Sequence, residues 1–422
     1  MNAFSKFTLG LTVTTAITFA GTFAAEAKEI TVWCWDPNFN VAIMKEAATR
    51  YGKTHPDVTV NIVDLNKGDV EQKLQTALAS NATDALPDIV LIEDYGAQKY
   101  LQSFPGSFEA LSDHGVDYSG MAPYKVQLMT LDGKVYGMPF DSGVTGLFYR
   151  KDYIEAAGYK PEDMQSLTWD KYIEIGKAVE EKTGHKMLGM DPADGGLIRI
   201  IMQSTGKWYF DMDGNPNIAG NEGLKAALTV EQKLLQSGIH KPASGWSDWV
   251  SKFTSGDVAS VITGVWITGT VKAQKDQAGK WGVAPIPMAD APGATNASNL
   301  GGSSWYVLAS SPEKNEAADF LNEIYGKDID FYQQILVNQG AVGSLLAARD
   351  GAAYSSTDDF FGGDKIWQSF SNWLGKVPAV NYGTFTNEAD AAVSAQLPAL
   401  ASGGSVDDAI KAIDEQVKTQ IQ

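Results

Sequence analysis

The chain has 422 residues, of which 44% are hydrophobic and 20% are charged, a composition typical of globular proteins with a substantial core. Its formal charge of −18 at pH 7 argues against nucleic acid as a partner, because an acidic surface repels phosphate. At roughly 150 residues per domain, the length predicts about two to three domains.

The first 27 residues have the pattern of a secretory signal peptide. Lys6 and the amino terminus are basic, residues 7–24 are apolar or small, and Ala25 and Ala27 occupy the positions of a cleavage motif. A transmembrane anchor is the alternative, but threonines weaken the stretch and no cluster of charges follows it. We expect cleavage after Ala27. No later segment has about 18 uninterrupted apolar residues.

Cys34 is the single cysteine, so no internal disulfide can form. It lies within TVWCW, past the cleavage point, and no lipobox-like sequence precedes it. We therefore expect a small buried side chain on a strand and no lipid anchor. An exported protein without disulfide or anchor indicates the bacterial periplasm.

Strands and helices alternate at the start of the mature chain. EITVWCW (29–35) is rich in β-forming residues, an amphipathic pattern over 39–55 predicts a helix, and 58–65 alternates like a strand. Residues 69–80 predict a second helix, and DIVLIE (88–93) predicts a strand that is buried on both faces. This order indicates a parallel α/β sheet.

A second α/β pattern follows. It consists of predicted helices over 170–182 and 223–237, predicted strands over 259–264 and 281–288, a strand and helix over 305–325, and a C-terminal helix over 406–421. Thr168 is the expected N-cap of the first of these helices.

Two polar, glycine-containing stretches read as connections between these α/β blocks. They are GMPFDSGVTGLFYRKDY (137–153) and PGATNASNLGGSS (292–304). Several crossings indicate a hinge between two lobes, and the groove between lobes is a natural ligand site. The predicted boundaries are 28–141 plus 303–345 for lobe 1, and 142–302 plus 346–422 for lobe 2.

Ligands of open α/β sheets bind beyond the carboxyl ends of the strands. In this chain those positions carry aromatic and polar residues instead of phosphate-binding glycine loops: Trp33, Trp35, Asp36, Asn38, Glu93, Asp94 and Tyr95. Indole rings beside carboxylates suit sugars, because a pyranose has an apolar C–H face and a rim of hydroxyls. Hydrogen bonds to a carboxylate are roughly twice as strong as neutral ones.

Metal, cofactor and nucleophile motifs are missing from the sequence. The four histidines are far apart, and DMDGNPN (211–217) reads as a β-turn because it lacks most of a calcium loop. There is no GxSxG or SxxK motif. Pairs of carboxylates could still act as acid and base in a glycosidase: Asp36, Glu93, Asp94, Asp141, Asp191 and Asp194.

Several segments together resemble the bacterial solute-binding proteins of ABC importers, in particular the sugar-binding group that includes maltose-binding protein. They are EITVWCW, LPDIVLIEDYGAQKY, GKVYGMPFDSGVTGLFYRKDYIEAAG, FTSGDVASVITGVWITG and GGSSWYVLASSPEKNEAADFLNEIYG. The resemblance covers essentially the whole mature chain, and within the group it is strongest to binding proteins for lactose and related galactosides.

The resemblance implies an α/β fold of two lobes, each a sheet flanked by helices, joined by a multi-strand hinge that closes around one sugar. Carried over to this sequence, the ligand-contacting positions are Trp33, Trp35, Asp36, Asn38, Glu93, Asp94, Asp141, Thr145, Asp194, Trp266, Gly302, Trp305 and Tyr382.

The sequence thus predicts a periplasmic carbohydrate-binding subunit of an ABC importer that delivers a di- or oligosaccharide to the membrane permease. We expect a monomer with no enzyme activity, no cofactor, no metal and no nucleic-acid partner. A secreted glycosidase and a binding protein for a non-sugar solute are the alternatives.

Overall fold

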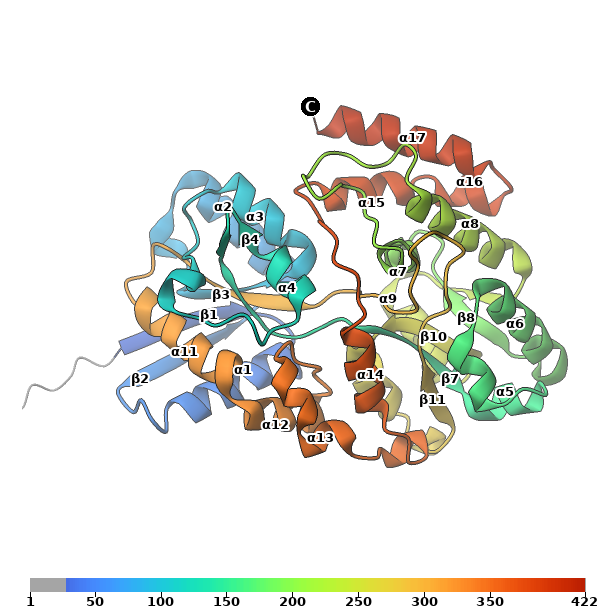
Figure 1. The fold of residues 1–422 in the computed structure, drawn as a ribbon, viewed down its shortest axis with the longest axis horizontal. Coiled ribbons are helices and arrows are strands. Elements are labelled where there is room, and N and C mark those ends of the chain that lie inside the picture. The colour runs from blue at the N-terminus through green and yellow to red at the C-terminus, as the bar shows by residue number, and fades with distance from the viewer. Residues whose placement is uncertain (1–27, 422) are drawn as a thin grey trace, which may run out of the picture.

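The computed structural model describes residues 28–421, which form two lobes side by side, each built on a five-stranded sheet (Figure 1). The predicted signal peptide, residues 1–27, lies outside the described residues. The α/β fold with two sheets flanked by helices is as predicted, and it follows from the alternation of strand and helix patterns along the chain.

Lobe 1 contains the sheet with strand order β2-β1-β3-β12-β6. Strands β1, β2 and β3 are parallel, and β12 runs antiparallel to β3 and β6. The strands are β1 (Lys28–Cys34), β2 (Val58–Asp64), β3 (Ile89–Glu93), β6 (Gly137–Pro139) and β12 (Ser303–Val307), with a hairpin of β4 (Thr130–Leu131) and β5 (Lys134–Val135). The helices are α1 (Asn40–Tyr51), α2 (Lys67–Ser80), α3 (Ala97–Ser103), α4 (Pro123–Leu128), α11 (Lys314–Lys327) and α12 (Ile329–Gln339).

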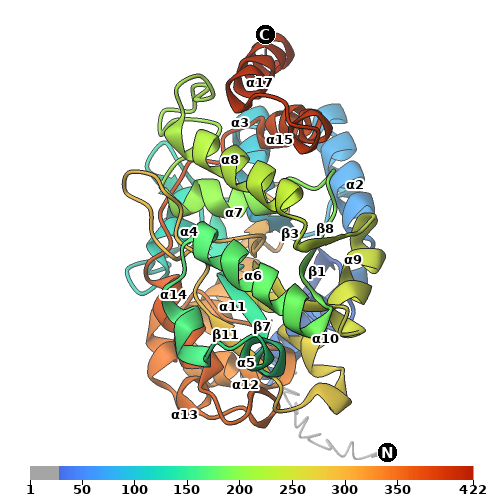
Figure 2. The same cartoon turned by 90° about the vertical axis from the view of Figure 1, so that its right-hand side faces the viewer.

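Lobe 2 contains the sheet with strand order β11-β7-β10-β8-β9. Its strands are β7 (Thr145–Arg150), β8 (Lys186–Met190), β9 (His240–Pro242), β10 (Val258–Gly264) and β11 (Trp281–Ala284). Its helices are α5 (Lys151–Ala156), α6 (Trp169–Thr183), α7 (Gly196–Ser204), α8 (Glu222–Ser237), α9 (Gly245–Thr254), α10 (Thr268–Lys272), α14 (Ile366–Leu374), α15 (Thr386–Ser394), α16 (Leu397–Ala401) and α17 (Val406–Gln420). Figure 2 shows α6 and α8 across the near face of this lobe, with α15 and α17 above them.

Local sequence signals set several element ends. Thr168 caps α6, since its side chain accepts a hydrogen bond from the Lys171 N–H at 3.2 Å, as predicted. The predicted strand over 281–288 is shorter than expected: β11 ends at Ala284 because Pro285 and Pro287 have no N–H to donate.

Cys34 is fully buried in the core of lobe 1, as predicted. Burial raises the pKa of its thiol to about 12, so the thiol stays protonated and unreactive at neutral pH.

Three segments lie side by side where the chain passes between the lobes. Residues 140–145 form the first connection, and the segments that contain Leu300 and Val342 lie beside it. Ser142 N–H donates to Val342 O at 2.9 Å, and Leu300 N–H donates to Gly143 O at 2.8 Å. A Cβ at Gly143 would lie 2.0 Å from the Leu300 carbonyl oxygen, so glycine is needed for this close approach. The stretch from Pro139 to Thr145 is therefore an interlobe crossing.

The lobe boundaries drawn from the sequence stay a prediction, and the segment after α12 packs differently from what they imply. Residues 346–350 and helix α13 (Ala352–Ser355) fall in the range predicted for lobe 2, yet they pack against α12 of lobe 1. The chain enters lobe 2 only after them, where α14 packs on β7.

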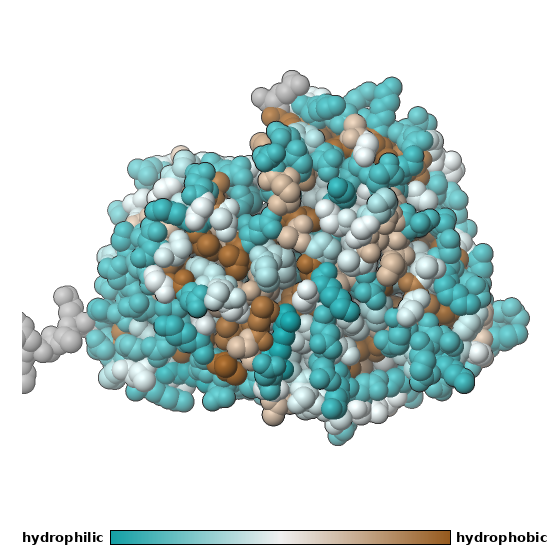
Figure 3. Space-filling model, viewed as in Figure 1, coloured by the Kyte–Doolittle hydropathy of each residue, from teal (hydrophilic) through white to brown (hydrophobic). Residues whose placement is uncertain are grey.

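Polar side chains cover most of the face shown in Figure 3, and the apolar areas on it are small and separate. Within residues 28–421, no helix is both long and apolar enough to cross a membrane.

Candidate functional site

A cavity of about 250 Å³ opens at the carboxyl ends of β8 and β10 in lobe 2. Aliphatic side chains of both strands and of α7 form its inner walls, among them Leu188, Ile200 and Val261. This is the edge of the sheet where α/β proteins bind ligands, and the volume is near the lower end of small-molecule sites, roughly 300–1,000 Å³.

Three tryptophans form one side of this cavity. Trp246 and Trp249 are three residues apart on α9, so they share one face of the helix, and their ring centres are 5.2 Å apart. Trp266 follows β10 and lies 5.7 Å from Trp246. Trp246 remains 58% exposed, which leaves a ring face open to a ligand.

The position of Trp266 depends on its neighbours. Its indole N–H donates to the Leu300 carbonyl oxygen at 2.9 Å. A Cβ at Gly264 would lie 2.1 Å from that indole nitrogen, so only glycine lets the ring lie across the strand end. The Trp266 ring is thus held at the edge of the cavity nearest the interlobe connection.

Carboxylates lie beside the tryptophans. Asp191 accepts a hydrogen bond from the Gly245 N–H at 2.6 Å, which joins the loop after β8 to the start of α9. Asp194 is exposed and accepts from the Gly196 N–H at 2.9 Å, at the first turn of α7. Both line the cavity, as does Glu231 of α8.

Lobe 1 approaches the cavity through Glu93, at the end of β3. A Cβ built on Gly301 would lie 3.4 Å from the Trp266 indole nitrogen and 3.9 Å from Glu93 Oε1, so these two side chains flank Gly301. Glu93 also forms an ion pair with Lys67 at the start of α2. A carboxylate of lobe 1 therefore faces the tryptophan side of the lobe-2 cavity.

Arg199 of α7 links the two lobes. Its guanidinium carbon lies 5.2 Å from the ring centre of Tyr95, which belongs to lobe 1. The guanidinium is paired with Asp390, and Asp194 Oδ1 lies 3.8 Å from Nη2. These carboxylates, together with the nearby Tyr95 and Tyr209 hydroxyls, raise the pKa of Arg199 despite its burial.

The structure gives Asp94 an internal partner. Lys125 Nζ lies 2.6 and 2.8 Å from its two carboxylate oxygens and also donates to Ser303 O at 2.9 Å. Both side chains are almost completely buried, at 1% and 0% exposed. Asp94 is therefore engaged in a structural ion pair in lobe 1, next to Glu93 but turned away from the cavity lining.

Asp141, Thr145 and Gly302 lie in the interlobe crossing. Asp141 accepts from the Ser303 N–H at 2.7 Å, and burial raises the pKa of its carboxyl to about 6. Thr145 is fully buried and its Oγ1 has no hydrogen-bond partner among the described residues. Gly302 has a φ of +90°, which favours glycine. None of the three lines the lobe-2 cavity.

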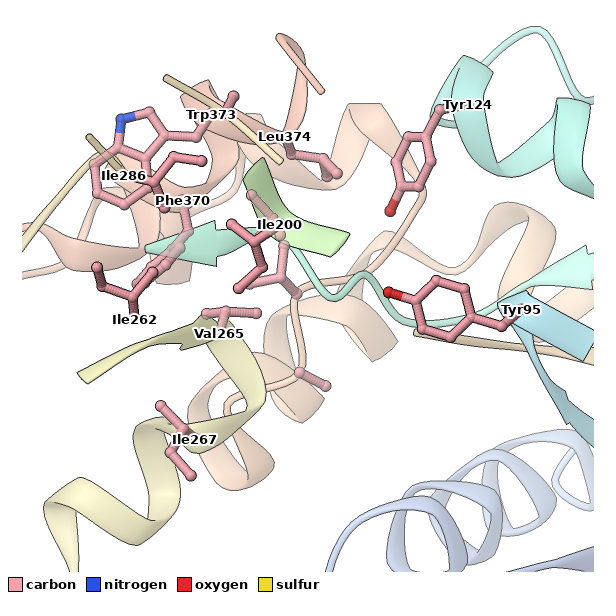
Figure 4. Close-up of a cluster of buried hydrophobic side chains, with 14 of the residues drawn as sticks. Tyr95, Tyr124, Ile200, Ile262, Val265, Ile267, Ile286, Phe370, Trp373 and Leu374 are labelled. Carbon is pink, nitrogen blue, oxygen red and sulfur yellow. The ribbon is translucent and has the colours of Figure 1, made fainter. Parts of the chain in front are cut away.

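Trp305 and Tyr382 are both fully buried. Trp305 packs in the core of lobe 1, with its ring centre 5.4 Å from that of Phe140, so it has no surface to offer a ligand. Tyr382 is wedged between Tyr95 and Trp208, with 4.6 Å between ring centres in each case. In Figure 4, Tyr95 and Tyr124 lie at the right of the view, and apolar side chains of lobe 2 such as Ile200 and Phe370 lie at the left.

The four predicted residues at the end of β1 and just after it do not lie together. Trp33 and Trp35 are partly buried against the apolar cluster beneath α2, and Trp35 shares a small pocket with Glu93. Asp36 has a φ of +65° and its side chain accepts from the N–H groups of Asn38 and Phe39, which organises the entry to α1. Asn38 is exposed. The predicted contact residues therefore do not share one hollow.

A metal site has no support in the structure. Among residues 28–421, no group of three or more His, Cys, Asp or Glu side chains is placed to hold an ion. The DMDGNPN segment is a turn, as predicted: Gly214 N–H donates to Asp211 O at 3.0 Å, and Asp211 Oδ1 accepts from the Asn215 N–H at 2.9 Å.

The model of the family described as "Bacterial extracellular solute-binding protein" matches residues 46–362. The chain belongs to this family. The family predicted from the sequence is thereby confirmed, and the two-lobed architecture is that of its members.

Individual relatives of this solute-binding protein are sugar-binding proteins. The lactose-binding protein of Rhizobium radiobacter is 67% identical over 399 residues, which cover 94% of each chain. Among solved structures, the β-1,6-galactobiose complex of a transporter-associated binding protein from B. animalis subsp. lactis has a TM-score of 0.71 and 25% identity, covering 93% of this chain and 97% of that one. MalE from Xanthomonas citri has a TM-score of 0.77 at 20% identity, covering 93% and 98%.

Of the residues predicted for the site of this solute-binding protein, the structure brings Trp266, Asp194 and Glu93 together around the cavity and its rim. The positions chosen from the sequence do not include Trp246, Trp249, Lys67, Arg199 or Glu231. The segment SGWSDW contained a usable signal, since two tryptophans at a spacing of three after a glycine share one helix face. Nothing in the sequence around Glu231 marks it, because it lies in an ordinary amphipathic helix.

Proposed function

We propose that this chain is the periplasmic sugar-binding subunit of an ABC importer and that its ligand is a galactose-containing disaccharide such as lactose. The observation that carries the proposal is the side-by-side arrangement of Trp246, Trp249 and Trp266 with Asp191 and Asp194 in the lobe-2 cavity. The high identity to a lactose-binding protein supports the choice of sugar.

The cavity supplies both kinds of contact that a pyranose needs. The open ring face of Trp246 can stack on the C–H face of the sugar, and the Asp194 carboxylate can accept hydrogen bonds from its hydroxyls. From lobe 1, Glu93 can contribute a further acceptor near Trp266. A ligand held by both lobes has more contacts in the closed state, so it shifts the equilibrium toward closure.

In this proposal, opening and closing of the lobes also deliver the sugar to the permease. The closed form presents both lobes in one orientation to the membrane permease, and opening releases the sugar there. We expect a monomer in the periplasm without hydrolytic activity.

Calorimetric titration of the mature chain with lactose, galactose, maltose and mannitol tests the proposal. We expect one-to-one binding of lactose with micromolar or tighter affinity, which is about −8 kcal/mol or more favourable. At a hundredfold excess over Kd, ligand should stabilise the folded protein by about 2.7 kcal/mol.

Two outcomes would contradict the proposal. Release of monosaccharides from labelled lactose during prolonged incubation would favour a glycosidase. Thermal stabilisation by amines or peptides, with no effect of any saccharide, would favour a different solute. Uptake of labelled lactose by cells that lack the chain, compared with complemented cells, tests the role in import.

A further inference from the structure

Glu231 is a carboxylic acid in the lining of the lobe-2 cavity, and the contacts proposed above do not use it. Its side chain projects from α8 and is 1% exposed. The Oε2 atom has no hydrogen-bond partner among the described residues, although the residue lines the cavity. Buried polar atoms are almost always hydrogen-bonded, so an unpaired one in a residue that lines a cavity points to a missing partner.

The surroundings of Glu231 are apolar or acidic. Leu188 and Ile200 line the same cavity, and Asp194 is the nearest charge that acts on the carboxyl group. Arg199, on the neighbouring helix α7, is already paired with Asp390. No cation of the described residues forms an ion pair with Glu231.

These surroundings favour the neutral acid. Burial, and to a lesser extent the Asp194 carboxylate, raises the pKa of Glu231 to about 8. At neutral pH the group then carries a proton, so it has an O–H donor as well as an acceptor oxygen. A sugar hydroxyl is likewise both donor and acceptor, so the two groups can pair without placing a charge in the apolar lining.

We propose that Glu231 forms a hydrogen bond with one hydroxyl of the sugar ring that enters the lobe-2 cavity, and that this bond determines which sugars the protein accepts. The inference rests on the proposed function, because it assumes that a saccharide occupies the cavity. It assigns the deepest polar contact to a residue of α8, behind the tryptophans and Asp194.

Specificity follows from what happens when the hydroxyl is missing. A sugar that has hydrogen in its place leaves Glu231 unpaired in an apolar cavity, and sites that pair with a substrate hydroxyl discriminate strongly against analogues that lack it. A sugar epimer that directs its hydroxyl elsewhere meets the same penalty. If a water molecule could take the place of the missing hydroxyl and bond to Glu231, the site would discriminate only weakly.

The test combines protein variants with ligand analogues. Wild type, Glu231→Gln and Glu231→Leu are titrated with lactose and with lactose analogues in which a single hydroxyl is replaced by hydrogen. For one analogue we expect the wild type to bind about tenfold more weakly than lactose. Glu231→Leu should bind lactose and that analogue equally, whereas Glu231→Gln should keep most of the discrimination, because an amide retains a donor and an acceptor.

Glu388 provides a matched control. Its Oε2 atom is also buried and has no hydrogen-bond partner within residues 28–421, but the residue belongs to α15 and does not line the cavity. Glu388→Gln and Glu388→Leu should leave the discrimination unchanged. Unfolding curves of every variant confirm that it is folded before titration.

Each other outcome overturns the inference. If Glu231→Leu discriminates among the analogues as the wild type does, Glu231 does not contact the sugar, while the proposed function still stands. Preferential binding of an amino sugar that is lost in Glu231→Gln would mean that the carboxylate pairs with a cation. If the wild type binds no saccharide at all, both proposals fail together.

Discussion

The guanidinium carbon of Arg199 in lobe 2 lies 5.2 Å from the ring centre of Tyr95 in lobe 1, so a cation of one lobe faces an aromatic ring of the other. Tyr95 also stacks on Trp208 of lobe 2, with 5.8 Å between the ring centres. These contacts join side chains of the two lobes, so we expect them to stabilise the arrangement of the lobes in this structure.

Replacing Tyr95 by Leu should therefore weaken ligand binding. A cation–π contact contributes about 0.5–2 kcal/mol, so we expect lactose affinity to fall about tenfold. Tyr95→Phe retains the ring and should bind nearly as well as the wild type. Titration measures the affinity, and small-angle scattering should show a more open average shape for Tyr95→Leu. An unchanged affinity and shape would show that Tyr95 does not hold the two lobes together.

Trp246 should contribute to binding more than to stability, because 58% of it is exposed in the unliganded cavity. We expect Trp246→Ala to lower lactose affinity by about 10–30-fold, as is common for a tryptophan at the centre of a binding site. Its melting temperature should change little. Val337→Ala removes another exposed apolar side chain, 65% exposed and away from the cavity, and should affect neither quantity. Equal affinities for the two variants would exclude stacking on Trp246.

Gly302 and Gly363 allow a matched test of the interlobe crossing. Their φ angles are +90° and +88°, so an alanine at either position costs about 1–2 kcal/mol of backbone strain. At Gly302 the added Cβ would also lie 2.8 Å from Asp94 Oδ2, whereas at Gly363 it would meet no atom within 4 Å. Gly302→Ala should therefore destabilise the fold by a further 1–3 kcal/mol or so. Urea unfolding measures the free energy of unfolding of both variants. Equal losses of stability would mean that the crossing has room for a side chain at Gly302.

The buried Asp94–Lys125 pair should be costly to break. Lys125→Met leaves the Asp94 carboxylate without its cation, and removing one partner of a buried pair typically costs about 3–5 kcal/mol. Lys134 pairs with Asp113 at the surface, where both side chains are 53% exposed, so Lys134→Met should destabilise the fold far less than Lys125→Met. The double variant Asp94→Leu/Lys125→Met should recover part of the loss in denaturant titrations. If the double variant recovers no stability, the loss in Lys125→Met comes mainly from disturbed packing and not from the unpaired Asp94 charge.

Glu231 should make stability depend on pH. Its pKa is about 8 in the folded protein and near 4.5 in an unfolded chain, so between these values the folded state holds a proton that the unfolded state releases. The contribution of Glu231 to the free energy of unfolding is most favourable below pH 4.5. It falls as the pH rises toward 8, by up to about 1.4 kcal/mol per pH unit. Relative to wild type, Glu231→Gln should gain stability from pH 5 to pH 8 in thermal unfolding. A constant difference would mean that Glu231 is ionised when folded.

Most of the fold could be predicted from local patterns along the chain. The apolar run of β3, the amphipathic pattern of α17 and the cap at Thr168 all act over a few residues, so the sequence shows them directly. The glycine-rich stretch around Gly143 also marks the crossing, because a backbone that passes so close to Leu300 excludes a side chain. The family could be predicted for the same reason, since its motifs are short contiguous segments.

The site was decided by contacts between distant segments. Asp94 directly follows Glu93, the last residue of β3, yet Lys125 pairs with Asp94 inside lobe 1. Trp305 is buried in the core, where it packs against Phe140. Glu231 reaches the cavity because α8 packs on α7, a relation between helices that no local pattern encodes. Sequence alone therefore determined the elements, their order and the kind of ligand chemistry. Which side chains line the cavity was decided only by the tertiary packing, because burial and pairing depend on neighbours far apart in the chain.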